Sequence, residues 1–391
     1  MKDIVIVGYA RTPIGSFQGA LASFTAPKLG AHAIKAALAR AKVKPEQVSE
    51  VIMGNVLTGG VGQAPARQAM IEAGIPPSVP ALTINKVCGS GMKAIMLGVQ
   101  SILTGESEIV VAGGQESMSN APYLMPSART GFRMGNAQVV DSMIHDGLWD
   151  PYNNQHMGAC GDLCAKEKSF SREEQDQYAV ESFKRAQSAQ AEKKFAGEIA
   201  PMTVTTKGES TLIEHDEGPS KVKFEKIPNL KPVFAKDGTI TAANASTLND
   251  GGAALVLMSA ETAKNLGLKP IARIIAQATH AQEPIWFTTA PAGAMKKVLD
   301  RAGWKMSDVD LVEVNEAFAV VALAAKRELE IPAEKLNVWG GAISLGHPIG
   351  ASGARLVITL ISALKDRGLK KGLAGICIGG GEATAIAIEI L

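Results

Sequence analysis

An internal repeat is the feature of this 391-residue sequence that most constrains its fold. Four segments in the first part of the chain resemble four segments near its end, in the same order, which one chance match would not explain. The matched pairs are Asp3–Thr12 with Pro270–Thr279, Val48–Asn55 with Val309–Asn315, 88–103 with 350–364, and 108–116 with 374–382. The repeat predicts two halves that are built alike.

Each half alternates short apolar strand patterns with helical patterns. IVIVG, EVIMG and EIVVAGG are β-rich runs, whereas 27–42 and 92–104 have apolar residues at helical spacing. This alternation is typical of α/β folds with right-handed crossovers and with sheets that are covered on both faces. The segment 92–104 is apolar nearly all round, which predicts a helix buried between two layers.

Residues from about 118 to 245 interrupt the repeat and predict an inserted domain that forms a lid or binds substrate. Its charged helix has Ser171 as the predicted N-cap, with Glu174 three residues on. We expect three domains: 1–117 plus 246–268 as the N-terminal half, 118–245 as the inserted loop domain, and 269–391 as the C-terminal half.

Composition excludes several classes of protein. A formal net charge of +2 argues against a nucleic-acid or membrane-surface partner, which would call for a concentrated basic face. We find no apolar run near the roughly 18 residues of a membrane span. The first residues enter a strand pattern at once, which leaves no room for a signal or transit peptide, so we expect a cytoplasmic protein. The four cysteines lack the spacing of a disulfide framework, so we expect free thiols.

Cys88 stands directly before Gly89-Ser90-Gly91, where an apolar strand pattern gives way to a helical one. A helix N-terminus lowers the pKa of a thiol, and glycines let backbone N–H groups approach a group bound to the sulfur. We therefore expect a nucleophilic thiolate at Cys88. A buried structural cysteine at the end of a strand fits the same position.

Three further residues stand where a strand end or a stiff loop would present them to a cleft. His347 lies between Gly346 and Pro348, and Asn315 ends the strand pattern DLVEV, where α/β sheets form their ligand crevices. Cys377 ends the last apolar strand pattern and matches the position of the IVVAGG strand in the first half. Each has a plain alternative: a loop histidine, a helix N-cap and a core cysteine.

His156, Cys160 and Cys164 are four residues apart, so a helix would place them along one face. The set has no fourth ligand nearby and matches zinc signatures poorly, and we expect no metal site. The glycine clusters match neither a P-loop nor the GxGxxG dinucleotide fingerprint.

Five motifs together resemble the thiolase family, and the resemblance covers essentially the whole chain. They are NKVCGSGMKA, NASTLNDGGAA, EVNEAFA, GGAISLGHPIGASGAR and CIGGGEA. Within that family the chain is most similar to the acetyl-CoA acetyltransferases. The resemblance implies a five-layered αβαβα fold, an α/β architecture of two pseudo-repeated halves with an inserted loop domain.

The resemblance also implies a role for each catalytic candidate. Cys88 matches the nucleophile that carries the acyl group as a thioester, and His347 matches the base that activates it. Cys377 matches the second cysteine, which moves a proton of the acetyl α-carbon. Asn315 matches the residue that positions a water in one oxyanion site with the histidine, and the amides of Cys88 and Gly379 resemble a second oxyanion site.

Coenzyme A would be a co-substrate, with no tightly bound cofactor. Positions that the resemblance places along its pantetheine arm and the acyl group are Leu148, His156, Met157, Phe234, Ala242, Ser246, Ala317 and Phe318. Many relatives offer the CoA phosphates a basic residue where this chain has Ser220, and we expect Lys221 to substitute for it. The implied assembly is a homotetramer, a dimer of dimers, with strand 108–116 pairing across the dimer.

Bulky side chains depart from the family pattern at three places: Trp339, Glu382 and Trp286-Phe287. We expect them to shrink or reshape the acyl pocket.

The expected reaction is the reversible Claisen condensation of two acetyl-CoA to acetoacetyl-CoA and CoA, or thiolysis of short 3-ketoacyl-CoA. Such chemistry needs a soft nucleophile, a second base and two oxyanion sites. The alternatives are a medium- or branched-chain 3-ketoacyl-CoA thiolase, a decarboxylating condensing enzyme and a non-catalytic acyl-binding member of the fold. Decarboxylating enzymes use two histidines, whereas here the third catalytic position is Cys377.

Overall fold

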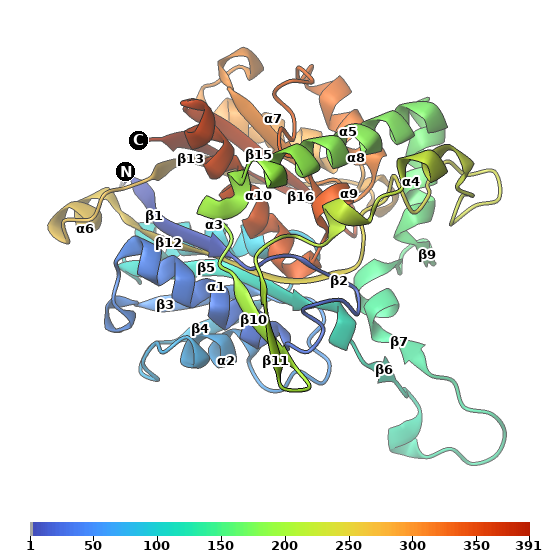
Figure 1. Ribbon diagram of the computed structural model, residues 1–391, viewed down its shortest axis with the longest axis horizontal. Helices are drawn as coiled ribbons and strands as arrows, with labels where there is room; N and C mark the ends of the chain where they lie inside the picture. Colours follow the sequence, from blue (N-terminus) through green and yellow to red (C-terminus); the bar gives the residue numbers. More distant parts are fainter. Residues whose placement is uncertain (1–2) are drawn as a thin grey trace.

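One mixed β-sheet runs through the computed structural model, which describes residues 3–391 (Figure 1). Its strand order is β14-β15-β16-β13-β1-β12-β5-β3-β4, with β2 beside β12. The strands are β1 Ile4–Arg11, β2 Gly15–Ser16, β3 Glu50–Gly54, β4 Ala81–Ile84, β5 Ile109–Ser117, β12 Asn249–Ser259, β13 Ala272–Ala281, β14 Leu311–Val314, β15 Lys371–Ile378 and β16 Glu382–Ile390. A short antiparallel pairing of Ile4, Val5 and Ile6 in β1 with β13 joins the two halves.

The two halves repeat the same strand pairings. In the first half β3 and β5 are parallel, whereas β12 pairs antiparallel with both β5 and β1. In the second half β14 and β15 are parallel, and β16 pairs antiparallel with both β15 and β13. The halves are therefore built alike, as the sequence repeat predicts.

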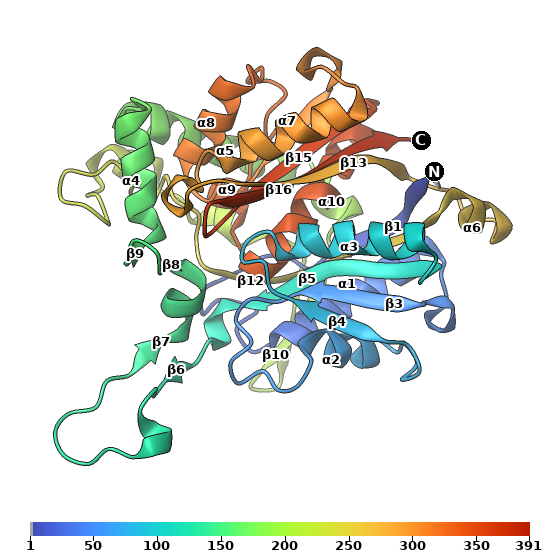
Figure 2. The ribbon, with the colours of Figure 1, turned by 180° about the vertical axis from the view of Figure 1, so that it is seen from behind.

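Helices cover the sheet in layers. They are α1 Ala26–Ala41, α2 Pro65–Glu72, α3 Ser90–Thr104, α6 Ala260–Asn265, α7 Ala290–Ala302, α8 Ala319–Glu328, α9 Ala342–Leu345 and α10 Ile349–Arg367. α1 and α2 pack on one outer face and α7 and α8 on the other, while α3 and α10 pack together between the two halves (Figure 2). The predicted αβαβα order is confirmed.

The central layer is deeply enclosed. Its apolar core combines Ile95 of α3, Leu356 of α10 and Ile386 of β16. Val87–Thr104 is long and apolar enough to cross a membrane by length and composition alone, so our expectation that no run approaches that length was wrong. Its packing against α10 and β5 is that of a core helix in a globular protein.

A close backbone approach places the start of α10 against the first half. A Cβ built on Gly114 of β5 would lie 2.0 Å from the carbonyl oxygen of Gly350 in α10. Only glycine permits such an approach. The segment that precedes α10 is therefore set directly beside the end of β5.

The inserted segment adds two helices and three small hairpins. They are α4 Met157–Glu167 and α5 Arg172–Ala191, with β6 Tyr123–Leu124, β7 Val140–Asp141, β8 Trp149–Asp150, β9 Gln155–His156, β10 Met202–Thr206 and β11 Glu209–Ile213. The loop between β6 and β7 extends away from the body of the protein (Figure 2). Ser171 caps α5 and Glu174 completes the capping box, as predicted.

The pairing of strand 108–116 across a dimer stays a prediction. Within one chain, β12 pairs with β5 along its whole length, whereas β3 pairs with it only from Val110 to Gly114. Its buried, apolar sequence reflects a central place in the sheet.

Candidate active site

Cys88 lies in a tight, strained connection between β4 and α3. The residue before it, Val87, has φ of 44°, which is rare for a β-branched side chain. Two side-chain contacts hold this turn: Asn85 Oδ1 accepts from the Val87 N–H at 2.9 Å, and Ser90 Oγ accepts from the Lys86 N–H at 2.8 Å. The turn presents the Cys88 sulfur at the start of α3.

The Cys88 sulfur faces backbone N–H groups, as expected, but it is not acidic. The amides of Gly379 and of Cys88 itself point at the sulfur and lower its pKa. Burial acts more strongly in the other direction and raises the pKa of Cys88 to about 12. Our expectation of a resting thiolate was therefore wrong: desolvation outweighs the helix N-terminus, and the thiol needs a base.

His347 is held in a short segment between α9 and α10. Gly346 has φ of 113°, which side chains rarely adopt, and this lets Asn249 approach the backbone. Asn249 Oδ1 accepts from the His347 N–H at 2.9 Å. This hydrogen bond fixes the backbone from which the imidazole projects.

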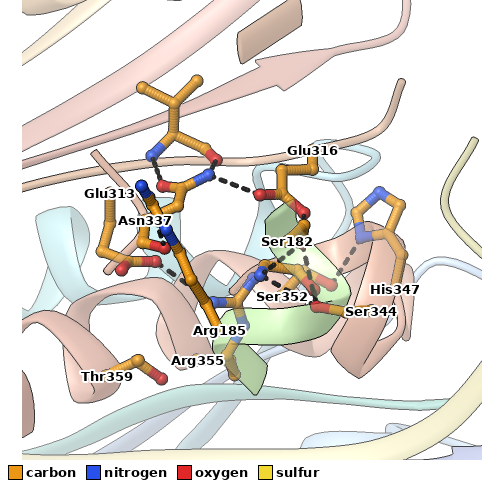
Figure 3. A network of polar contacts seen from close by, with 12 residues as sticks. Ser182, Arg185, Glu313, Glu316, Asn337, Ser344, His347, Ser352, Arg355 and Thr359 are labelled. Atoms are coloured by element: carbon orange, nitrogen blue, oxygen red, sulfur yellow. Dashed lines mark hydrogen bonds and ion pairs between the residues drawn. The ribbon is translucent and has the colours of Figure 1, made fainter. Parts of the chain in front are cut away.

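The hydrogen bonds of the imidazole define its protonation. Ser352 Oγ donates to the Pro348 carbonyl at 2.9 Å and lies 2.6 Å from His347 Nδ1, so we infer that it accepts from Nδ1–H (Figure 3). Nε2 then carries the lone pair, 3.4 Å from Asn315 Nδ2. Burial, and next the charge of Arg355, lower the pKa of His347 to about 3. His347 is therefore a neutral base at physiological pH.

Cys377 lies at the end of β15, near Cys88 and Asn315. Its thiol is fully buried and is hydrogen-bonded by the Asn315 side chain and by the backbone of Ala317. Burial raises the pKa of Cys377, and a negative charge on Cys88 would raise it further. The cysteines of the two repeats thus lie near enough to interact.

A cavity of about 440 Å³ brings most of the predicted site together. Cys88, His347 and Gly379 line it, whereas Asn315 and Cys377 do not reach its wall. The predicted substrate contacts that line it are Leu148, His156, Met157, Phe234, Ala242, Ser246, Ala317 and Phe318. Its wall is mostly apolar, as suits a pantetheine arm and a short acyl group.

Lys221 lies outside this cavity. It lines an adjoining hollow of about 620 Å³ together with Lys223 and Lys226. Ala242 and Ser246 line both hollows, so the two adjoin each other. Lys221 also pairs with Glu217 at 3.4 Å.

We expected Trp339, Glu382 and Trp286-Phe287 to reshape the acyl pocket, and this was mostly wrong, because of these residues only Phe287 lines the cavity. Trp339 packs edge-on against Phe195 in the central core, with ring centroids 5.6 Å apart. Glu382 instead pairs with Lys86. Phe287 packs against Phe318 with ring centroids 6.4 Å apart, and both side chains line the cavity.

Sequence reasoning missed the residues that orient the site, chiefly Asn249, Ser352 and the buried carboxylate of Glu116. Asn249 and Ser352 stand inside recognised motifs, NDGG and GASG, so their position was the available signal. Asn249 contacts His347 across 98 residues and Glu116 contacts Gly350 across 234 residues, which no local pattern reveals. Ser352 contacts His347 only five residues earlier in the chain.

Models of the thiolase N-terminal and C-terminal domains match residues 4–261 and 268–390. The chain belongs to the thiolase family.

Individual thiolases are similar to this chain along its full length. It is 54% identical over 391 residues to the acetyl-CoA acetyltransferase of Cupriavidus necator, with 100% of both chains covered. It is 53% identical to the mitochondrial acetyl-CoA acetyltransferase of Rattus norvegicus, covering 100% of this chain and 92% of the relative. The crystal structure of the Bacillus anthracis acetyl-CoA acetyltransferase superimposes with a TM-score of 0.98 at 41% identity, covering 100% of this chain and 99% of that one.

The protonation of His347 predicts an acid-sensitive fold. Its pKa lies near 3 when folded against 6.5 unfolded, so between these values the unfolded chain binds the extra proton. This share of the stability is complete above pH 6.5 and is lost as the pH falls, by about 1.4 kcal/mol per unit. Urea unfolding should show this slope in the wild type and a shallower one in His347→Gln. Parallel slopes would contradict the assignment.

Proposed function

We propose that this thiolase transfers acetyl groups reversibly between CoA thioesters, making acetoacetyl-CoA and CoA from two acetyl-CoA or the reverse. The observation that carries the proposal is that Cys88, His347 and Gly379 share one apolar cavity, with Cys377 directly behind. The similarity to acetyl-CoA acetyltransferases over the full chain supports this substrate.

The first half-reaction acylates Cys88. The Cys88 sulfur attacks the thioester carbonyl while Nε2 of His347 takes its proton, because the thiol is too weakly acidic to ionise unaided. The tetrahedral oxyanion is stabilised by backbone N–H groups that already point at this sulfur, those of Cys88 and Gly379. When the carbonyl re-forms, His347 returns the proton to the departing CoA sulfur.

The second half-reaction forms the carbon–carbon bond. Cys377 must first lose its proton to His347, and Asn315 contacts both groups. The Cys377 thiolate then removes a proton from the acetyl α-carbon of the second acetyl-CoA, which requires the cavity wall to shift, because Cys377 lies just behind it. The enolate attacks the acyl carbon on Cys88, the Cys88–carbon bond breaks, and the proton on His347 returns to the Cys88 sulfur. Protons balance, and all three residues regain their starting state.

The outer hollow suits the nucleotide end of CoA. Lys221, Lys223 and Lys226 gather positive charge there, and phosphates bind such lysines as point charges. The hollow shares Ala242 and Ser246 with the catalytic cavity, and we infer that the pantetheine arm passes between the two there. This arrangement supports CoA as a co-substrate that is exchanged in each turnover.

We also propose a homotetramer. The loop between β6 and β7 exposes Phe132, Met134 and Val139, and Met134 is 99% exposed in the single chain. Copies of the chain would cover these side chains on assembly.

A substrate panel tests the proposed reaction. We expect the highest kcat/KM with acetoacetyl-CoA plus CoA, and lower values with 3-ketohexanoyl-CoA and 2-methylacetoacetyl-CoA, because Phe287, Phe318 and Met157 crowd the cavity. Thiolysis is followed by loss of the 3-ketoacyl absorbance. Preference for the six-carbon substrate would favour the medium-chain alternative, and no turnover of any substrate would favour a non-catalytic protein.

Variants of the two cysteines test the division of labour between them. Cys88→Ser should lower acyl-enzyme formation by at least about a thousand-fold, because it removes the nucleophile. Cys377→Ser should leave acylation by acetyl-CoA largely intact and stop condensation. Intact-protein mass spectrometry measures the first step and acetoacetyl-CoA formation the second. Equal loss of both steps in Cys377→Ser would contradict the mechanism.

A further inference from the structure

Two buried carboxylates hold the ends of the segment that carries His347. At one end, the Ile343 N–H in α9 donates to Glu316 Oε2 at 3.1 Å. At the other end, the Gly350 N–H in α10 donates to Glu116 Oε2 at 2.9 Å. Both carboxylates are fully buried, and they come from opposite halves of the chain.

Glu116 also binds the loop that follows β3. Its Oε1 accepts from Asn55 Nδ2 at 2.7 Å and from the Leu57 N–H at 3.1 Å, and its Oε2 accepts from the Val56 N–H at 3.0 Å. Together with Gly350, four N–H donors surround this carboxylate, two on each oxygen. Both oxygens must therefore be acceptors for the arrangement to persist.

Glu316, in the second half, also accepts four hydrogen bonds. Its Oε1 accepts from the Tyr178 hydroxyl at 2.8 Å and from Asn337 Nδ2 at 2.9 Å. Its Oε2 accepts from the Ser182 hydroxyl at 2.8 Å as well as from Ile343 (Figure 3). The inserted helix α5, which supplies Tyr178 and Ser182, is thereby tied to the same segment.

We propose that Glu116 and Glu316 are positioning residues that fix His347 for proton transfer to and from Cys88. Neither carboxylate contacts the imidazole, so each acts through the backbone of residues 343–350. A catalytic group displaced by about 1 Å can lose about a hundred-fold in rate, and such second-layer contacts are worth about ten- to a hundred-fold. The inference rests on the proposed acyl transfer only for its turnover readout.

Replacing each glutamate by glutamine removes the hydrogen bonds that hold residues 343–350, with little change in side-chain volume. In Glu116→Gln and Glu316→Gln the amide nitrogen cannot accept, so one side of the cluster loses its N–H bonds. We expect each to lower kcat by about ten- to a hundred-fold while KM for acetoacetyl-CoA changes by less than about three-fold. Burial raises the pKa of Glu116 to about 7, so assays are run above that pH, where its carboxylate is charged.

Alkylation of Cys88 by iodoacetamide gives a readout that does not depend on turnover. The reaction needs a base at the sulfur, and we expect its rate to fall with kcat in both variants. In the His347→Ala background, Glu116→Gln should lower the alkylation rate much less than it does in the wild type, because the imidazole that Glu116 positions is absent. Full additivity of the two losses would overturn the proposal.

Glu198→Gln is the matched control. Glu198 is as fully buried, and it accepts from Arg11 Nε at 2.7 Å and Thr359 Oγ1 at 3.1 Å, away from the His347 segment. Glu198→Gln should lower the thermal midpoint of unfolding without lowering kcat.

If Glu316→Gln does not fold, Tyr178→Phe removes one hydrogen-bond donor to the Glu316 carboxylate and should give a smaller fall in kcat at constant KM. Wild-type kcat in folded Glu116→Gln, or an equal fall in Glu198→Gln, would contradict the inference. An inactive wild type would instead contradict the proposed function.

Discussion

Burial of His347 at the junction of the two halves is the constraint on which the rest of the site depends. Removal from water keeps the imidazole uncharged, with Nδ1 bonded to Ser352 and the lone pair of Nε2 facing Asn315 Nδ2. Desolvation likewise raises the pKa of Cys88 and keeps its thiol protonated at rest. In the mechanism that we propose, the two residues therefore start as a neutral acid and a neutral base, and the proton moves when the thioester is attacked.

The repeated architecture explains how such a pair can be assembled. Equivalent strands β5 and β15 run to the same region, and equivalent helices α3 and α10 start there, so each half supplies one cysteine-bearing loop or helix start. The repeats are not equivalent in chemistry. Cys88 opens a helix at the cavity wall, whereas Cys377 ends a strand and lies behind it. This difference is consistent with the roles that we propose, in which Cys88 carries the acyl group and Cys377 is the second base.

Much of this could be predicted from the sequence, for reasons that lie in particular residues. The repeat predicted the two halves, and the motifs around Cys88, His347 and Cys377 indicated which loops would meet. The pKa of Cys88 could not be predicted, because the helix start is visible in the sequence but the enclosure of the sulfur is not. Trp339 looked like a pocket residue because it is near His347 in the chain, yet its side chain points into the central core. Glu116 and Glu316 were overlooked because their partners come from segments far apart in sequence.

The resting protonation of Cys88 is the central claim, and thiolate absorbance in the ultraviolet measures it directly. The difference spectrum between the wild type and Cys88→Ser should show no thiolate near neutral pH, because the pKa of Cys88 is raised to about 12 and that of His347 is lowered to about 3. A thiolate band that is already present at neutral pH and disappears in Cys88→Ser would contradict the account, because it would show a preformed thiolate–imidazolium pair.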